Sequence, residues 1–178
     1  MIKHIYIASC KYDGGIYHYV FEDGKLNFID KVNLDRPMYM LIRNNKMYVL
    51  LREIDTDTHF GGLISYDIDK DGKIINPSDI MSTNGIVPCH LDVTEDGIYI
   101  VNYLSGNIVK MPDKIVAHKG MGVHKTRQDA PHTHFTMRTP DKKHILCTDL
   151  GTDEIFIYDE QLNEQFAVKV PSGSGARH

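Results

Sequence analysis

The sequence predicts an all-β fold, and three observations support this prediction. Short segments rich in Ile, Val and Tyr alternate apolar and polar residues, as half-buried strands do. Asp-Gly pairs, which favour tight turns, separate several of these segments, at 23–24, 71–72 and 96–97. No window has the periodicity of a long amphipathic helix. A chain of 178 residues is long enough for one domain with a buried core.

A repeat organises the predicted strands. The segment YIVNYLSGNI at 99–108 aligns without gaps on LCTDLGTDEI at 146–155, and each copy is an apolar strand that ends in Asn or Asp, a polar turn and a second strand. A third copy has MYVLL at 47–51 and GLISYD at 62–67, and a fourth has YIAS at 6–9 and GIYHY at 15–19. Units of about 40–50 residues with four short strands indicate a β-propeller.

The repeat also gives the predicted blade boundaries. A strand that opens on proline precedes three copies, at Pro37, Pro88 and Pro131. We expect an incomplete first blade at 1–36, then blades at 37–87, 88–130 and 131–174, and the start of a further repeat at 175–178. A propeller commonly closes by pairing strands from its two ends, and such a strand is missing here. The sequence thus predicts about four blades of a larger ring, because a closed four-bladed ring would leave one blade without its inner strand.

Charge and cysteine content restrict the partners and the compartment. The net charge is −4 without the ten histidines, so the chain lacks the basic surface typical of nucleic-acid or anionic-membrane binding. The three cysteines form no close pair, which argues against a disulfide framework or a zinc ribbon. No signal peptide is recognisable, and we expect a cytoplasmic protein. Because the edges of an open half-ring tend to pair, we expect association with a missing C-terminal half or with another copy.

The segment RQDAPHTH at 127–134 is the densest group of chemically active residues. His132 and His134 are two positions apart in a predicted strand, so we expect them to face the same side, with Arg127 nearby. The repeat predicts that other polar residues reach the same rim of the central channel. These are His90, Arg177 and His178, while Asn102 and Asp149 occupy equivalent ends of second strands.

These motifs together resemble the seven-bladed lactonase family typified by 6-phosphogluconolactonase and by fungal 3-carboxymuconate cyclase. The matching stretches follow the family order along the whole chain: YIAS at 6–9, PCH at 88–90, VNYxSG at 101–106, RQxxPHxH at 127–134, TDLGxD at 148–153 and GxGxRH at 173–178. The series RQ, PHxH and DLGxD is the specific part. Ala176 departs from the pattern, because the family usually has proline there, and family members are nearly twice as long.

The resemblance implies a lactone hydrolase that works by water attack in the channel of a seven-bladed propeller. It implies a sugar lactone as the small-molecule partner, 6-phosphogluconolactone above all, a place in the pentose phosphate pathway, and no metal or other cofactor. Such a reaction needs a base for water, a cation or donor for the developing oxyanion, and groups that hold the sugar. In this interpretation His132, His134 and Arg127 are catalytic, and the substrate is bound by His90, Asn102, Asp149, Arg177 and His178.

Several alternatives stay open at this point. A carboxymuconate-type cycloisomerase would use the same arginines and histidines, and a non-catalytic propeller would serve as a binding platform. His132, His134 and Asp149 could also ligate a metal, although no third ligand stands at a recognised spacing. Polar residues at repeated blade positions often hydrogen-bond turns and neighbouring blades, so a structural role for His90, Asn102 and Asp149 stays open as well. A serine hydrolase is disfavoured, since no GxSxG motif occurs.

Overall fold

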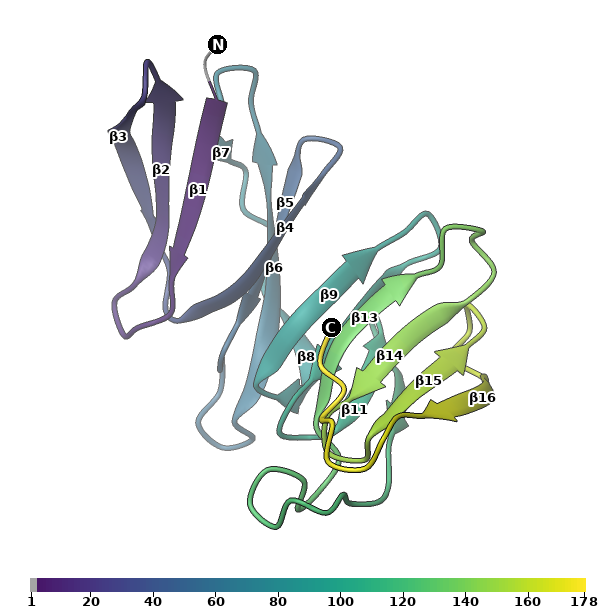
Figure 1. Cartoon of the computed structure of the whole chain (residues 1–178). Coiled ribbons are helices and arrows are strands. Elements are labelled where there is room, and N and C mark those ends of the chain that lie inside the picture. The colour runs from purple at the N-terminus through teal and green to yellow at the C-terminus, as the bar shows by residue number, and fades with distance from the viewer. Residues whose placement is uncertain (1–2) are drawn as a thin grey trace.

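The structure, a computed structural model, describes residues 3–178, which form sixteen β-strands and no helix. The strands build four antiparallel sheets that follow one another along the chain and stand side by side as a fan (Figure 1). The prediction of an all-β propeller with about four blades is therefore confirmed. The first and the fourth sheet lie apart, so the four sheets do not close into a ring of their own (Figure 1).

Each sheet uses strands that are consecutive in the sequence. The first sheet has the order β1 (Lys3–Ser9), β2 (Gly15–Glu22) and β3 (Lys25–Asn33). The second has β4 (Pro37–Arg43), β5 (Lys46–Leu51), β6 (Phe60–Ile68) and β7 (Ile74–Ile75), and β8 (Met81–Ile86) also pairs with β6. The third has β9 (Pro88–Val93), β10 (Ile98–Asn102), β11 (Asn107–Lys110) and β12 (Lys114–Ala117). The fourth has β13 (Thr133–Arg138), β14 (Ile145–Asp149), β15 (Glu154–Tyr158) and β16 (Glu164–Lys169).

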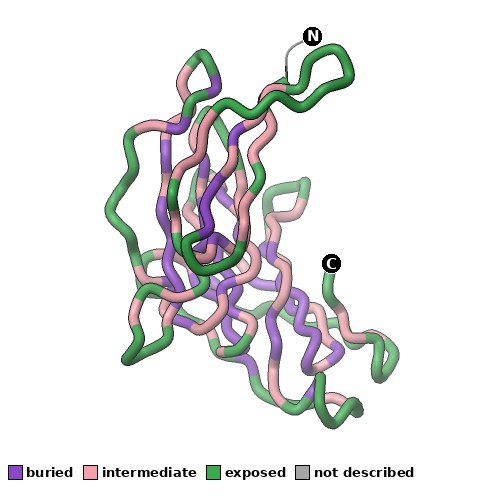
Figure 2. Tube along the Cα trace, turned by 90° about the vertical axis from the view of Figure 1, so that its left-hand side faces the viewer, coloured by how far each residue is buried: buried purple, intermediate pink, exposed green. Residues whose placement is uncertain are grey.

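Apolar cores fill the spaces between successive sheets. Alternate residues of β5 enter different cores, because the side chains of a strand point to opposite faces. Met47 and Val49 pack toward the first sheet, and Leu50 packs toward the third. Full burial of each such side chain contributes about 1.5–3 kcal/mol. Buried residues lie along the middle of the fan, whereas the turns and outer strands are exposed (Figure 2).

The strands at the inner edge of the fan share a local irregularity. Each of β4, β9 and β13 has a register shift directly after its first paired residue. The pairs at the three starts are Pro37 with Leu51, Pro88 with Asn102, and Thr133 with Asp149. The counterpart of Pro37 and Pro88 is therefore Thr133, and the prediction that this strand opens at Pro131 is wrong. Pro131 belongs to the loop 118–132, and the shift is a β-bulge that disturbs the simple alternation of side chains.

Candidate active site

A row of four rings runs along the inner edge of the fan, next to the bulges of the inner strands. One ring comes from each of β4, β9 and β13, and the fourth comes from the C-terminal segment: Tyr39, His90, Phe135 and His178. The ring centroids are 4.5 Å apart for Tyr39 and His90, 4.4 Å for His90 and Phe135, and 5.6 Å for Phe135 and His178. Such a row offers a ligand an apolar, polarisable wall with polar edges.

Arg177 contacts His134 beside this row. The Nε–H of Arg177 donates to Nε2 of His134 at 2.8 Å, and the ring of His178 meets that of His134 edge-on at 5.0 Å. Burial, reinforced by the charge of Arg177 and by His178, lowers the pKa of His134 to about 4. His134 is therefore neutral near pH 7, and its proton is on Nδ1 because Nε2 is the acceptor. Among residues 3–178, that buried Nδ1 finds no hydrogen-bond partner.

His90 is a second neutral imidazole in the row. Burial, followed by the neighbouring His178, lowers the pKa of His90 to about 4. Its Nδ1 accepts the backbone N–H of Thr136 at 3.4 Å. The proton of the neutral ring is therefore on Nε2, which makes His90 a hydrogen-bond donor rather than a base.

His132 is anchored on both of its ring nitrogens. Nδ1 lies 3.1 Å from the backbone oxygen of Tyr103, and Nε2 lies 3.2 Å from Oδ1 of Asp129. A carbonyl and a carboxylate only accept, so both contacts are made fully when the ring carries both protons. His132 also stacks on the Tyr103 ring at 4.5 Å, and His134 meets the same ring edge-on at 6.0 Å. The two histidines thus converge on Tyr103. The prediction that both lie in one strand is wrong, because His132 precedes β13 and His134 lies at its register shift.

Asp149 and Asn102 lie in the interior, between blades, with no exposed surface. Asp149 accepts from the ring of His118 at 2.7 Å and from the backbone N–H of His132 and of Gly151, both at 2.8 Å. The Nδ2 of Asn102 donates to the backbone oxygen of Thr83 and to Oδ1 of Asn107. Their predicted role in binding substrate requires an exposure that neither residue has.

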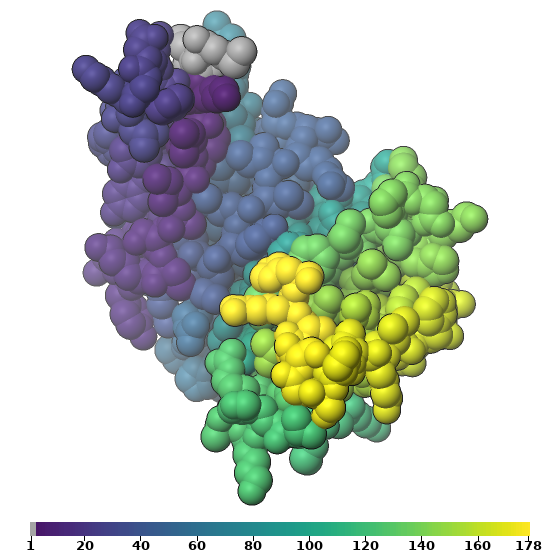
Figure 3. Space-filling view, viewed as in Figure 1, coloured from purple at the N-terminus to yellow at the C-terminus, as the bar shows by residue number. Residues whose placement is uncertain are grey.

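Arg127 is exposed in the loop 118–132 and does not join the row of rings. Among residues 3–178 its guanidinium makes no hydrogen bond or ion pair. Its neighbour Gln128 is buried and donates to the backbone oxygen of Leu150 and to Asp153. Gln128 belongs to the motif at 127–134 and Asp153 to the motif at 148–153, but nothing in the sequence indicated that these two residues are buried. Figure 3 shows this loop in green beside the yellow C-terminal segment.

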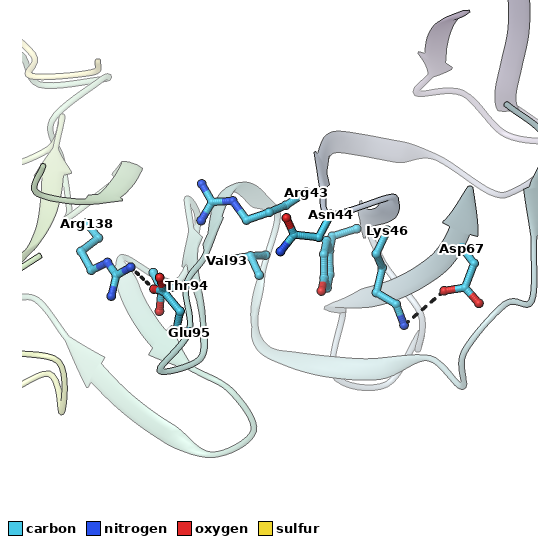
Figure 4. Close-up of a pocket in the computed structure, with 9 residues that line it drawn as sticks. Arg43, Asn44, Lys46, Asp67, Val93, Thr94, Glu95 and Arg138 are labelled. Atoms are coloured by element: carbon cyan, nitrogen blue, oxygen red, sulfur yellow. Dashed lines mark hydrogen bonds and ion pairs between the residues drawn. The ribbon is translucent and has the colours of Figure 1, made fainter. Parts of the chain in front are cut away.

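A surface cavity of about 550 Å³ lies where β4, β9 and β13 end, whereas the row of rings lies near the starts of these strands. Figure 4 shows the residues that line the cavity. Arg43, Lys46 and Arg138 face it, but acidic partners neutralise each of them. Arg43 pairs with Asp92, Lys46 with Asp67, and Arg138 with Glu95 and Asp96. No charge is left uncompensated there, so we place the candidate site at the row of rings.

Neither a metal-binding cluster nor a membrane-spanning helix is present in the part of the chain that the structure describes. Over residues 3–178, no group of three His, Cys, Asp or Glu side chains is arranged to hold a metal ion. Within the same range, no helix is long and apolar enough to cross a membrane.

The family assignment follows from comparison with known proteins. The family model described as "Lactonase, 7-bladed beta-propeller" matches residues 4–178. The chain belongs to this lactonase family. Within it, the 6-phosphogluconolactonase of Bacillus subtilis (strain 168) is 29% identical over an alignment that covers 100% of this chain and 56% of that protein. The chain spans about half the length of the curated relatives it matches.

Solved structures show the same relationship. A crystal structure from Bacteroides fragilis NCTC 9343 superposes with a TM-score of 0.81 at 25% identity, over 99% of this chain and 56% of that one. The periplasmic gluconolactonase of Pseudomonas aeruginosa superposes with a TM-score of 0.79 at 20% identity, over 100% of this chain and 58% of that one, a likeness of fold alone. The four sheets thus correspond to about half of a seven-bladed lactonase propeller, as the sequence predicted.

The two neutral imidazoles predict an acid-sensitive fold. His90 and His134 have pKa values of about 4 in the folded protein, below the ordinary value of 6.5, so the unfolded chain binds more protons between these limits. Their contribution to stability is complete above pH 6.5 and is lost as the pH falls toward 4. Because both rings are partly solvated, we expect a loss on the order of 1 kcal/mol for the pair at pH 5. Urea unfolding at pH 7.5 and pH 5 measures it, and a variant with His90→Gln and His134→Gln should lose less.

Proposed function

We propose that this protein hydrolyses a sugar lactone, with 6-phosphogluconolactone as the leading substrate. The observation that carries the proposal is the group at the inner edge of the fan, where a guanidinium, two neutral imidazoles and a row of rings meet. A cation and a hydrogen-bond donor suit the developing oxyanion of an ester carbonyl and the anionic group of the substrate. Membership of the lactonase family supports the same reaction.

Arg177 and His90 would act on the charges of the substrate. The Nε of Arg177 is engaged by His134, and its terminal amino groups have no partner among residues 3–178. A guanidinium with free donors binds a phosphate or polarises a carbonyl. The Nε2–H of His90 is a second donor within the row. The rings of Tyr39 and Phe135 flank His90 and would pack against the sugar.

His134 would accept a proton from water only after the hydrogen bond from Arg177 to its Nε2 has been broken. In the structure Arg177 occupies Nε2 of His134, and after burial its charge is the second cause of the lowered pKa of that ring. An anionic substrate that draws the guanidinium away would free Nε2 and remove the part of the pKa lowering that is due to Arg177, which would make His134 a stronger base. Binding of the substrate would in this way make Nε2 of His134 available as the general base. His132, whose two nitrogens are engaged, would hold Tyr103 and the start of β13 in place rather than act as the base.

The test is hydrolysis of freshly prepared 6-phosphoglucono-δ-lactone by the intact protein that contains this chain, followed by acid release at constant pH. Glucono-δ-lactone without phosphate is the matched substrate. We expect hydrolysis well above the buffer rate and a preference of about tenfold or more for the phosphorylated lactone, since Arg177 would bind the phosphate. Rates equal to buffer with both lactones would rule out the proposal, and turnover of a muconate-like acid instead would indicate a cycloisomerase.

We also propose that further blades of the same ring cover the two open faces of the fan. Ile7 and Phe28 on the first sheet, and Phe166 and Val168 on the fourth, are 46–56% exposed. The supporting observation is that a family with seven blades is matched over about half its length. Expressed by itself, the 178-residue chain should associate through these faces and sediment as more than one 20.3 kDa unit. The double variant Phe28→Asp and Phe166→Asp should shift it toward monomer, and a wild-type chain that is purely monomeric would contradict the proposal.

A further inference from the structure

We infer that Asp153 is a positioning residue that, together with Gln128, docks residues 171–178 at the candidate site and so sets the contact between Arg177 and His134. The docking itself does not depend on what the protein hydrolyses. Its value for catalysis rests on the proposed function.

The carboxylate of Asp153 is the centre of this arrangement. The residue is 5% exposed and lies in the turn between β14 and β15. Its Oδ2 accepts the backbone N–H of Gly173 at 2.7 Å, and its Oδ1 accepts the N–H of Gly175 at 2.7 Å. Burial raises the pKa of Asp153, but the hydrogen bonds from both glycines and from Gln128 outweigh it and lower the pKa below its usual value. The carboxylate is therefore charged, and each of its oxygens accepts a backbone N–H from the segment that leads to Arg177.

The docked segment has a backbone shape that requires glycine. Gly173 and Gly175 have φ values of +82° and +62°, in the left-handed region that a residue with a Cβ rarely adopts. In this shape both N–H groups turn toward Asp153. One further bond fixes the end of the segment, where the hydroxyl of Thr148 donates to the backbone oxygen of Arg177 at 2.9 Å. Three hydrogen bonds to the fourth blade thus place the backbone from which the Arg177 side chain reaches His134.

Gln128 connects the same carboxylate to the loop 118–132. Its Nε2 donates to Oδ1 of Asp153 at 2.7 Å and to the backbone oxygen of Leu150 at 2.9 Å, and its Oε1 accepts the N–H of His124 at 3.1 Å. The side chain is 3% exposed, so breaking these bonds would leave buried polar groups unpaired. One carboxylate therefore joins two long segments beside the site, and both must be in place for Arg177 to meet His134.

The variant Asp153→Asn tests the docking. Asn keeps the size of the side chain and tolerates the φ of +58° that Asp153 adopts, but it presents a donor where a glycine N–H needs an acceptor. We expect the protein to fold, amide exchange at Gly173 and Gly175 to accelerate by about tenfold or more, and the pKa of His134 to rise by about half a unit or more in an NMR titration, since Arg177 is no longer held beside it. The kcat/KM for the lactone should fall by about tenfold or more.

The matched control is Asp159→Asn. Asp159 also accepts backbone N–H groups in the fourth blade, from Gln161 and Asn163, but it follows β15 at the opposite end from Asp153. It should leave the titration of His134 and the exchange of Gly173 and Gly175 unchanged. If Asp153→Asn leaves them unchanged too, Asp153 is only part of a turn and the inference is overturned.

A second variant separates docking from general loss of structure. Arg177→Met removes the guanidinium and keeps the docked backbone. It should raise the pKa of His134 by itself, and adding Asp153→Asn should raise it no further, because both changes remove the same contact. Fully additive shifts would contradict the inference. If the wild type hydrolyses no lactone, the proposed function fails, yet amide exchange and titration still decide the docking.

Discussion

Replacing Asp149 with alanine is expected to destabilise the protein by about 3–5 kcal/mol, the largest effect of any single substitution we predict. The carboxylate has no exposed surface and accepts three hydrogen bonds, from the ring of His118 and from the backbone N–H of His132 and Gly151. Truncation would leave all three donors buried without partners, and each orphaned group costs about 1–3 kcal/mol. Part of the loss would be offset by water entering the space. The midpoint of urea unfolding at pH 7.5 measures the change.

The variant Asp129→Ala is the control for this prediction. Asp129 also bonds His132, at 3.2 Å, but its side chain is 62% exposed. Water replaces such an interaction readily, so we expect a change below about 1 kcal/mol. An effect of Asp149→Ala no larger than that of Asp129→Ala would show that the buried network between the third and fourth blades contributes little to stability.

The fold was predictable because its signal repeats. Apolar alternation recurs in every blade and Asp-Gly turns occur in the first three, so a wrongly predicted strand can be recognised by comparison with the equivalent strands of the other blades. The bulges escaped prediction, since one extra residue in a strand changes neither composition nor turn signals. In β13 the register shift lies between Thr133 and Phe135, and the strand begins at Thr133, so His132 lies before the strand and His134 lies at the shift.

The candidate site was predictable only in part, because repeat position does not reveal what packs against a residue. Asn102 and Asp149 were correctly aligned as equivalent strand ends, yet burial depends on partners from elsewhere in the chain. His118, which hydrogen-bonds the buried Asp149, lies 31 residues earlier in the sequence, in a loop without periodicity. The same loop holds the neighbours Arg127 and Gln128. The sequence motif favoured Arg127, which is exposed, as a site residue, whereas the buried Gln128 makes the hydrogen bond to Asp153.

Replacing Arg177 with methionine is expected to lower kcat/KM for 6-phosphoglucono-δ-lactone by about 100-fold or more, comparable to the loss of one oxyanion donor or phosphate clamp. Methionine keeps much of the side-chain length and leaves the bond from Thr148 to the Arg177 backbone intact, so stability should change little. The exposed Arg127 is the control, and Arg127→Met should cost less than about tenfold because its guanidinium lies outside the row of rings. For glucono-δ-lactone, which has no phosphate, the Arg177→Met loss should be smaller. Equal losses for both lactones would place Arg177 on the carbonyl rather than the phosphate, whereas no loss with either would remove it from the site.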